Sequence, residues 1–579
     1  MGGRLVFNAQ PLPGLKITAL AAPTLNFDKT KTYNQIIEYT GLDDPTRVLF
    51  QNRQNITLSE ARPEAFIFNG QFLIDYHKEI GDGHQFEALL GYEENYHRAE
   101  SLSGYRGSFT LSGLPYLSAG NLDLRDNASN ASESALRSGF GRLKYNYKNK
   151  YYLQGNLRLD GSSRFHRDHR WGWFPSFSAG WTVSEEAFMN DIAETIPFLK
   201  FRFAWGNVGN ERIGNYPYQA FMSFENSLYY RGNTIVPVQT AAQQVYAVQE
   251  ITWETTESMD IGMDVAFLNQ RLSLTADYYQ KRTRDILLTL DIPSYLGFDA
   301  PNQNAGVVGA KGYDIEVKWA DNVGDLKYSI GANLSDVKTE ILDLKGTQRR
   351  GATAQIEGYE FNSWFGYRSD GLYQTPEDVA NSPVPNNNTR AGDVKYMDID
   401  GDGRITPEAD MVPLGGSLPR YTFGGAMRLD YKGFDFHLAF QGVGKVLSRL
   451  NSVQVEPFLA NWGNMPTNID GNFWSTYNTP EENLAARYPR LSRASAENNY
   501  QMSDFWLING RYFRIKNITL GYNLPPSAVS RLRMQGLRVY LAANDMFGLH
   551  GFPRGWDPEV GSVTYPMVST FMAGIRITL

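Results

Sequence analysis

The sequence predicts an all-β, transmembrane antiparallel β-barrel, and three observations lead to this fold class. In residues 151–162, Tyr151, Leu153, Leu157 and Leu159 alternate with polar side chains, so one face is apolar and the other carries charge. Strand-sized alternating segments of this kind recur along the whole chain. No run approaches the roughly 18 apolar residues of a transmembrane helix. These features favour strands with one side in lipid and the other in water.

The composition fits strands of that kind. Tyr, Phe and Trp make up 13% of the 579 residues, a high proportion for a chain whose mean hydropathy is −0.41. Half of the side chains of a barrel strand are polar, which lowers the mean hydropathy but leaves room for many aromatic residues. The charge balance is mildly acidic, with 55 basic and 62 acidic side chains, so we expect no nucleic acid partner.

The predicted strands follow one another as antiparallel hairpins, about sixteen in all, and one of the seventeen candidate segments is expected to be a loop hairpin. Tight turns are predicted at Asn149, at Asn269-Gln270 and at Lys432-Gly433. The candidate segments are 3–10, 14–27, 64–79, 84–100, 135–148, 150–162, 171–184, 198–209, 253–268, 271–284, 306–320, 325–339, 420–431, 434–445, 506–523, 536–546 and 565–579.

Long connections alternate with the tight turns and are rich in Gly, Pro, Asn and Ser, as loops are. Their approximate ranges are 101–134, 206–250, 286–306, 340–419 and 447–504. Short turns at one rim and long loops at the other are typical of bacterial outer-membrane barrels, so we expect the long loops to be extracellular. Nothing in the sequence marks a second domain, and residues 1–579 are interpreted as barrel throughout.

Several short motifs occur in order along the chain. One is Asp160-Gly161-Ser162-Ser163-Arg164-Phe165, which is followed by RWGWFPS at residues 170–176. The others are GNVGN at 206–210, WETT at 253–256, GDVKY at 392–396, RIKNITLGY at 514–522 and AGIRITL at 573–579. In this order, and over nearly the whole chain, they resemble the SusC/RagA family of TonB-dependent outer-membrane transporters.

The resemblance implies a barrel of about 22 strands that is filled by an N-terminal plug. This chain would supply about the last sixteen strands, without the plug. Its first residues, MGGRLVFNAQ, lack the basic and apolar regions of a signal peptide. We therefore expect the chain to be the C-terminal part of a longer exported protein. The alternative is a complete porin, because sixteen to eighteen strands enclose an open aqueous channel.

The resemblance also implies a function and partners. Family members import oligosaccharides, and in some cases peptides, across the outer membrane of Gram-negative bacteria, and the expected host belongs to the Bacteroidota. A SusD-like surface lipoprotein covers the extracellular loops as a lid, and TonB acts through an N-terminal part that the resemblance places before this chain. A passive porin is the first alternative, because it would conduct without TonB or lipoprotein.

A soluble all-β enzyme that acts on glycans is the second alternative. It would need two carboxylates that converge on one point. The pairs Glu93-Glu94 and Glu185-Glu186 are adjacent in sequence, and neighbouring residues of a strand point to opposite faces. The motifs Gly-x-Ser-x-Gly and His-Glu-x-x-His are both absent from the sequence. We therefore predict that the chain is not an enzyme and uses no organic cofactor.

One stretch has the ligand spacing of a calcium loop. Asp398, Asp400 and Asp402 alternate as in an EF-hand, Gly403 permits the sharp turn, and the Arg404 carbonyl is the expected next ligand. The later positions depart from the EF-hand pattern, and the nearest carboxylates that would close the site are Glu408 and Asp410. The sequence predicts a structural Ca²⁺ in an extracellular loop, because so many like charges repel one another without a cation. The alternative is a metal-free Asp/Gly turn.

Other side chains have two interpretations each. Tryptophans near strand ends are predicted to form an interfacial girdle; they are Trp171, Trp173, Trp181, Trp205 and Trp253. Tryptophans in or beside long loops would either stack on sugars or pack in loop cores; they are Trp364, Trp462, Trp474 and Trp506. Arg158, Asp160 and Arg164 are interpreted as a salt-linked lumen wall, and His166 and His169 as solvated loop residues.

Overall fold

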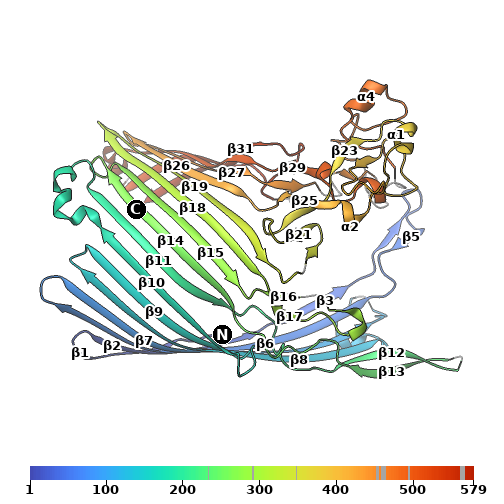
Figure 1. Cartoon of the computed structure of the whole chain (residues 1–579), viewed down its shortest axis with the longest axis horizontal. Coiled ribbons are helices and arrows are strands. Elements are labelled where there is room, and N and C mark those ends of the chain that lie inside the picture. The colour runs from blue at the N-terminus through green and yellow to red at the C-terminus, as the bar shows by residue number, and fades with distance from the viewer. Residues whose placement is uncertain are drawn as a thin grey trace. The chain divides into compact units, whose positions relative to one another are not determined.

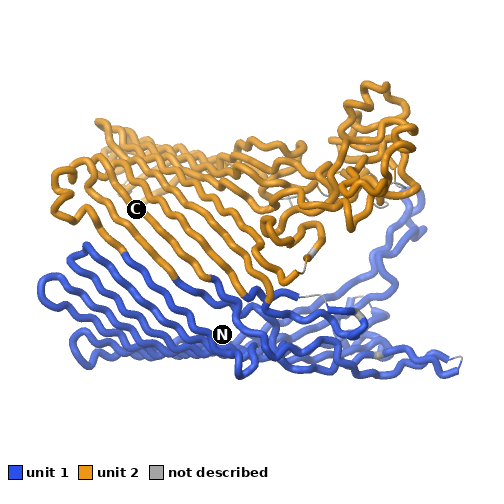
Figure 2. Tube along the Cα trace, viewed as in Figure 1, with its two compact units in different colours: residues 1–179, 206–256, 285–304 blue, residues 180–205, 257–284, 305–579 orange. Residues whose placement is uncertain are grey.

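The computed structural model describes residues 1–111, 113–232, 234–289, 292–346, 348–450, 455–457, 465–492, 496–531, 533–560 and 567–579. Strands dominate it (Figure 1), and no helix among the described residues combines the length and the apolar character needed to cross a membrane. The chain divides into two compact units (Figure 2). Unit 1 comprises residues 1–179, 206–256 and 285–304, and unit 2 comprises residues 180–205, 257–284 and 305–579.

Unit 1 contains a continuous series of antiparallel strand pairs, in which β1 pairs with β2, β2 and β3 with β6, and β6 to β9 each with the next. Strands β6 and β7 are 24 residues long each. The strands of the series are β1 (Leu5–Leu12), β2 (Leu15–Phe27), β3 (Thr30–Asn34), β6 (Thr57–Ile80), β7 (His84–Gly107), β8 (Arg125–Tyr147) and β9 (Tyr151–Ser162). Shorter elements are β4 (Glu38–Thr40), β5 (Val48–Gln51), η1 (Leu117–Ala119), β12 (Ser223–Arg231), β13 (Thr234–Ala242), β16 (Leu287–Thr289), η4 (Ser294–Leu296) and β17 (Asn302–Asn304).

Unit 2 contains a second antiparallel series, which runs through β15, β18, β19, β26, β27, β30, β31 and β32. Its strands are β15 (Leu272–Arg284), β18 (Val307–Val323), β19 (Leu326–Asp343), β26 (Arg420–Tyr431), β27 (Phe434–Lys445), β30 (Tyr512–Asn523), β31 (Gly536–His550) and β32 (Thr570–Thr578). Strands with residues in both units are β10 (Trp171–Thr182), β11 (Phe198–Asn210) and β14 (Glu254–Phe267). The helical turns η2 (Val183–Glu185), η3 (Ala187–Ile192) and α6 (Pro526–Arg531) also belong to unit 2.

Positive backbone angles confirm the predicted tight turns. Asn149 has a φ of 55°, Asn269 a φ of 57° and Lys432 a φ of 46°, followed by Gly433 at 91°. Turns with positive φ match the right-handed twist of the strands that they join, and Asn and Gly tolerate that conformation best. The hairpins therefore close at the positions that the sequence indicates.

Exposure along β9 is the reverse of that in a soluble sheet. Tyr151, Leu153 and Leu157 are 41–47% exposed, while Arg158 on the opposite face is half-buried and Asp160 is buried. A large apolar side chain gains nothing from contact with water, so a sheet with this pattern requires an apolar environment on its outer face. The alternation therefore has the polarity of a membrane barrel rather than that of a soluble sandwich.

All seventeen predicted segments contain a strand of the long antiparallel sheet, so none of them is the expected loop hairpin, and several strands extend well beyond their predicted ends. Strand β7 continues to Gly107 and β8 begins at Arg125, so much of the predicted loop 101–134 is paired sheet. Strand β6 begins at Thr57 rather than at residue 64. In these extensions both faces carry polar residues, and the apolar alternation on which the prediction depended stops before the hydrogen bonds do. Residues 565 and 566 of the last segment lie outside the described part of the chain.

The two longest predicted loops of unit 2 fold together into one body, which we call the loop module. It consists of the described residues of 344–419 and 446–511. Its strands are β20 (Arg349–Arg350), β21 (Thr353–Gln355), β22 (Ser363–Tyr367), β23 (Ser369–Leu372), β24 (Val394–Tyr396), β25 (Met411–Gly416), β28 (Leu447–Arg449) and β29 (Leu507–Asn509). Its helical segments are α1 (Pro376–Ala380), α2 (Pro407–Asp410), α4 (Pro480–Ala485), α5 (Ala496–Asn499) and η6 (Asp504–Trp506).

Candidate functional site

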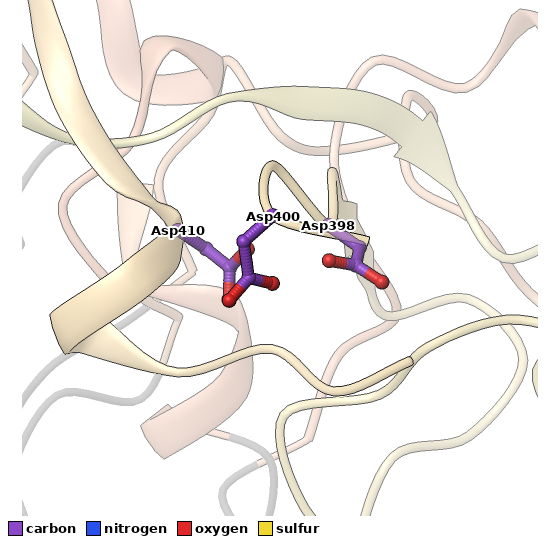
Figure 3. Close-up of side chains that lie close together, drawn as sticks. All are labelled: Asp398, Asp400 and Asp410. Atoms are coloured by element: carbon purple, nitrogen blue, oxygen red, sulfur yellow. The ribbon is translucent and has the colours of Figure 1, made fainter. Parts of the chain in front are cut away.

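The acidic stretch predicted to hold calcium lies between β24 and β25 in the loop module. Three of its carboxylates, those of Asp398, Asp400 and Asp410, approach one another (Figure 3), and a ligand oxygen from each lies within 4.8 Å of the other two. Among the described residues, this is the one group of three or more His, Cys, Asp or Glu side chains close enough to share a metal ion. The geometry therefore gathers three of the predicted ligands.

Backbone hydrogen bonds hold these carboxylates in place. The N–H groups of Gly401 and Gly403 donate to the two oxygens of Asp398 at 2.7 and 2.8 Å. Both glycines have a positive φ, of 78° and 84°, which lets the loop wrap around that carboxylate. Asp410 is fully buried and accepts from the N–H groups of Ile399 and Thr406 at 2.7 and 2.6 Å. It closes the loop from the end of α2.

The electrostatics of the loop are those of crowded negative charge. The N–H groups of Gly403 and Gly401 lower the pKa of Asp398. At Asp400 the N–H of Asp402 favours the charged form, but desolvation and repulsion by Asp402 and Asp410 outweigh it and raise the pKa. Burial, with repulsion by Asp410 and Glu408, raises the pKa of the neighbouring Tyr367 phenol to about 12. A bound cation would relieve this repulsion.

The other two predicted carboxylates, those of Asp402 and Glu408, are not gathered into this group. Asp402 turns its carboxylate to the backbone N–H of Arg404, at 2.8 Å. Glu408 is outside the group, and its backbone carbonyl accepts a hydrogen bond from Arg350 at 3.3 Å. Ca²⁺ prefers six to eight oxygen ligands, and the geometry brings together one oxygen from each of the three carboxylates. The donor set therefore fits a hard divalent cation that completes its shell with water or carbonyl oxygens.

The GDVKY motif at 392–396 forms the core of the loop module. Val394 and Tyr396 are buried with Tyr367, Leu372, Ile405 and Trp474 in one apolar cluster. Gly392 has a φ of 87°, and a Cβ atom there would lie 2.3 Å from the Trp474 ring, so this position requires glycine. The motif is therefore where the second loop, which carries Trp474, packs onto the first.

A buried polar network joins the same two loops. Asp393, which has no exposed surface, accepts from the Arg490 guanidinium at 2.7 Å and from the Asn499 amide at 3.0 Å. Asn499 in turn accepts from the N–H of Val394 at 2.9 Å, and Tyr396 donates its hydroxyl hydrogen to the carbonyl of Asn498 at 2.6 Å. More than 90 residues of sequence separate each pair of partners, and local sequence patterns do not predict such contacts.

The motif at 160–165 leads out of β9 in unit 1. Asp160 pairs with Arg158 at 2.7 Å, and Gly161 lies against the ring of Trp171, which a Cβ atom there would contact at 2.6 Å. Ser162 accepts from the N–H of Arg164 at 3.1 Å, and Ser163 from that of Ala135 at 2.8 Å. These contacts fix the end of the strand and the turn that follows it.

Arg164 and Phe165 complete the motif by tying three loops together. Arg164 donates to the carbonyl of Ile213 at 2.6 Å. Phe165 is fully buried, and its cluster contains Phe174, Ile213, Ile251 and Trp253. We call this cluster the Phe165 core. The interpretation of Arg158 and Asp160 as a salt-linked wall agrees with their ion pair, but Arg164 departs from it, because its guanidinium donates to a backbone carbonyl instead.

The tryptophans divide into exposed and packed groups. Trp171, Trp173 and Trp181 are 39–60% exposed, as a girdle requires. The prediction is wrong for Trp253, which is 7% exposed in the Phe165 core and donates to the Arg170 carbonyl at 2.8 Å. Its position at a strand start gave no sign of the loops that cover it. Trp205 is half-buried and donates to Glu257 at 3.0 Å.

The loop tryptophans behave as loop cores. Trp474 and Trp506 are 7% and 2% exposed, and Trp364 donates to the Leu447 carbonyl at 2.7 Å. Trp474 and Trp506 therefore offer no open ring face for sugar stacking, whereas Trp364 is half-buried. Trp462 lies outside the described residues. His166 lies 3.2 Å from Asp168 rather than in a metal cluster.

A family model described as "TonB dependent receptor-like, beta-barrel" matches residues 8–545. The chain is 28% identical over 538 residues to TonB-dependent receptor P3 of Formosa agariphila, covering 87% of this chain and 51% of the relative. It is also 28% identical over 535 residues to TonB-dependent receptor SusC of Bacteroides thetaiotaomicron, covering 87% and 49%. The chain thus spans about half the length of the curated relatives that it matches.

Solved structures share the fold. The RagAB peptide transporter superposes with a TM-score of 0.81 at 21% identity, over 100% of this chain and 61% of that one. The RagAB peptide importer in its "open-open" state gives 0.79 at 21% identity, over 99% and 60%. At this level of identity the likeness establishes the architecture of the barrel and says nothing about its cargo.

Proposed function

The chain belongs to the TonB dependent receptor-like β-barrel family, and on that premise we propose that it is the barrel part of an outer-membrane nutrient importer. The observation that carries this proposal is the reversed exposure of the strands, with Leu153 and Leu157 outward and Arg158 inward. Such a wall is suited to a bilayer outside and to a hydrated path inside. The importer is of the SusC/RagA type and is a binding and gating device rather than a catalyst.

The proposed cargo is an oligosaccharide or a peptide, held under a SusD-like surface lipoprotein. The size of the loop module supports a lid partner, because a tied, two-loop body offers a rigid platform where single loops would not. Oligosaccharides and peptides are the two cargo classes that the resemblance to the SusC/RagA family implies. Energy would come from TonB, acting on a plug that precedes the barrel.

A structural calcium ion is proposed for the acidic loop. Asp398, Asp400 and Asp410 would be its carboxylate ligands. Such an ion supplies charge neutralisation and no redox chemistry. The chain's own contribution is to fix the carboxylates through backbone N–H groups before the ion arrives.

Uptake by intact cells tests the proposed function. Cells that carry the complete gene are given fluorescent pools of oligosaccharides or of peptides, with and without functional TonB. We expect one pool to accumulate only when both TonB and the partner lipoprotein are present. Equal entry without TonB, together with ion conductance in planar bilayers, would instead identify a passive porin. A protein that stays out of the outer-membrane fraction would contradict both interpretations.

A further inference from the structure

A groove runs along the outward face of unit 1, over strands β7, β8 and β9, which lie side by side in Figure 1. Its volume is about 840 Å³. The floor is the backbone of Gly139 and Gly141 on β8 and of Gly155 on β9. These glycines share the outward face with Leu157, because Gly141 is paired with Leu157 and Gly155 with Leu143. The groove is therefore open to whatever surrounds the outer wall.

Neither side-chain packing nor backbone conformation within the chain requires glycine at these three floor positions. A Cβ atom at Gly139 or Gly155 would meet nothing within 4 Å, and one at Gly141 would make only ordinary contact with Leu90 at 3.4 Å and with the Leu89 carbonyl at 3.7 Å. None of the three has a positive φ. On the inward face, by contrast, Gly91 is required by packing, because a Cβ there would collide with the Phe140 ring at 2.2 Å.

A glycine inside a strand costs stability and usually marks a bulge, a sharp bend or the close approach of another molecule. A bulge is excluded, since the pairing of β7 with β8 and of β8 with β9 runs without a shift in register. Of the other two causes, the open space above the floor favours the close approach of another molecule.

The walls identify the chemistry of that ligand. Leu90 stands on one side of the β8 floor and Leu157 on the other, and Leu143 and Trp173 also line the groove. Leu90, Leu143 and Trp173 are 60–68% exposed, so they border the groove without filling it. The two walls stand two strand spacings apart, about 10 Å between backbones, which leaves a narrow slot between their side chains. A slender, flexible, wholly apolar molecule fits such a slot better than a folded protein surface does.

The height of the groove on the wall agrees with a lipid tail. Gly155 lies about 17 Å along its strand from Lys150, and Gly139 about 31 Å from Lys148, at about 3.4 Å per residue. With strands tilted by about 40°, these positions correspond to depths of about 13 and 23 Å within an apolar band of about 25 Å. The turn at 148–150 supplies positive charge at the rim, where Lys148 lies 5.4 Å from the Tyr147 ring centroid. A phospholipid whose phosphate lies at that rim would place an acyl tail along the groove.

We propose that this groove is a binding site for an acyl chain of a membrane phospholipid, seated over Gly139, Gly141 and Gly155. The inference rests on the membrane location in the proposed function. A retained lipid would fill a defect in the outer wall and would couple β7, β8 and β9 to the surrounding bilayer.

The first experiment counts lipids on the full-length protein after purification from outer membranes in mild detergent. Native mass spectrometry should find about one tightly held phospholipid per chain that the Gly141→Leu variant lacks. Leucine at this position fills the groove and favours the strand more than glycine does, so lipid loss would not reflect unfolding. The control is Ala573→Leu, which enlarges an exposed, outward side chain on β32 away from the groove. It should retain lipid as the wild type does.

Equal lipid retention by wild type and Gly141→Leu would overturn the proposal. So would a variant that keeps its lipid but changes its oligomeric state, because the groove would then be a contact between two copies. Outer-membrane fractionation and heat-modifiable gel mobility of the wild type separate this outcome from failure of the proposed function. If the wild type passes both tests and lipid retention is still equal, the groove alone is refuted.

A second measurement needs no variant. The wild type is reconstituted with a phospholipid that carries a photoreactive group in its acyl chain. Cross-links should concentrate on peptides from 84–107, 125–147 and 151–162. Peptides from β15 (272–284) and β18 (307–323), which do not line the groove, should carry fewer. An even distribution over both sets would show ordinary annular lipid and contradict a specific site.

Discussion

The Phe165 core of unit 1 and the loop module of unit 2 both hold long connections together at the ends of barrel strands. They differ in the kind of polar contact that does so. In the Phe165 core the polar ties run from a side chain to a backbone carbonyl, as from Arg164 to Ile213 and from Trp253 to Arg170. In the loop module the central tie joins two charged side chains, Asp393 and Arg490, and Asp393 is fully buried.

This difference predicts different sensitivities. A carbonyl acceptor is neutral, so losing its donor leaves a modest desolvation penalty. A buried carboxylate without its cation leaves an uncompensated charge, and that penalty is far larger. The Phe165 core should therefore depend mainly on shape, whereas the loop module should depend on charge. Hydrogen exchange measured by mass spectrometry resolves the two regions in one sample, and it is the measurement for the changes below unless another is named.

The largest effect is expected for Arg490→Ala. The substitution leaves the buried Asp393 carboxylate without its cationic partner. We expect the free energy of unfolding of the loop module to fall by roughly 3–5 kcal/mol. Exchange should accelerate at 392–396 and 498–506, while the Phe165 core stays protected. Arg487→Ala, on an exposed arginine three residues away, is the matched control and should change little. Unchanged protection at 392–396 in Arg490→Ala would show that Asn499 and the backbone N–H of Arg390 satisfy the carboxylate without the arginine.

Trp253→Phe tests the other side of the comparison. The ring contacts with Phe165 and Phe174 are largely kept, but the bond to the Arg170 carbonyl is lost. We expect the free energy of local unfolding to fall by roughly 1–2 kcal/mol, which would be seen as faster hydrogen exchange around 165–174. The exposed Trp173→Phe should be neutral in the same assay. A loss as large as that of Arg490→Ala would remove the distinction between the two regions.

The strands could be predicted from the sequence because their information is local. Alternation with a period of two marks a wall that has lipid on one side, and a turn such as Lys432-Gly433 marks its end. The loop cores could not be predicted, because their contacts are long-range. Asp393 and Asn499 are 106 residues apart, and no periodicity links them.

The candidate metal site shows the same division. The spacing of Asp398 and Asp400 predicted their approach, and Asp410 was one of two carboxylates expected to close the site. That Asp410 rather than Glu408 joins the group depends on how α2 turns back towards the loop, which the sequence does not specify. The likeness of GDVKY and DGSSRF to family motifs could be seen in the sequence, but not their role. Both motifs turn out to be packing centres, with Tyr396 at 2% and Phe165 at 0% exposed.

Calcium should stabilise the loop module and not the Phe165 core, because the acidic loop lies in the loop module. With an affinity typical of extracellular calcium modules, millimolar Ca²⁺ should stabilise the module by about 1 kcal/mol. Chelation should therefore speed exchange at 398–411 and leave 160–174 unchanged. Asp398→Asn should abolish the difference between calcium and chelator. Identical exchange with and without calcium in the wild type would establish a metal-free Asp/Gly turn.

The smallest expected effect concerns Asp378 of α1, which shows how much burial matters for a charge pair. Its carboxylate accepts from Lys395 at 2.8 Å, and although desolvation opposes ionisation, Lys395 and the N–H of Gln374 lower the pKa overall. A lowered pKa means that this stabilisation is present above the ordinary value near 4 and is lost as the pH falls below it. Because both side chains remain about one quarter exposed, we expect the pair to contribute only about 0.5 kcal/mol to the stability of the loop module. Asp378→Asn should slightly speed exchange at 376–382 at neutral pH and reduce the further increase that the wild type shows on acidification below pH 4. A loss comparable to that of Arg490→Ala would mean that exposure does not govern the strength of charge pairs in the loop module.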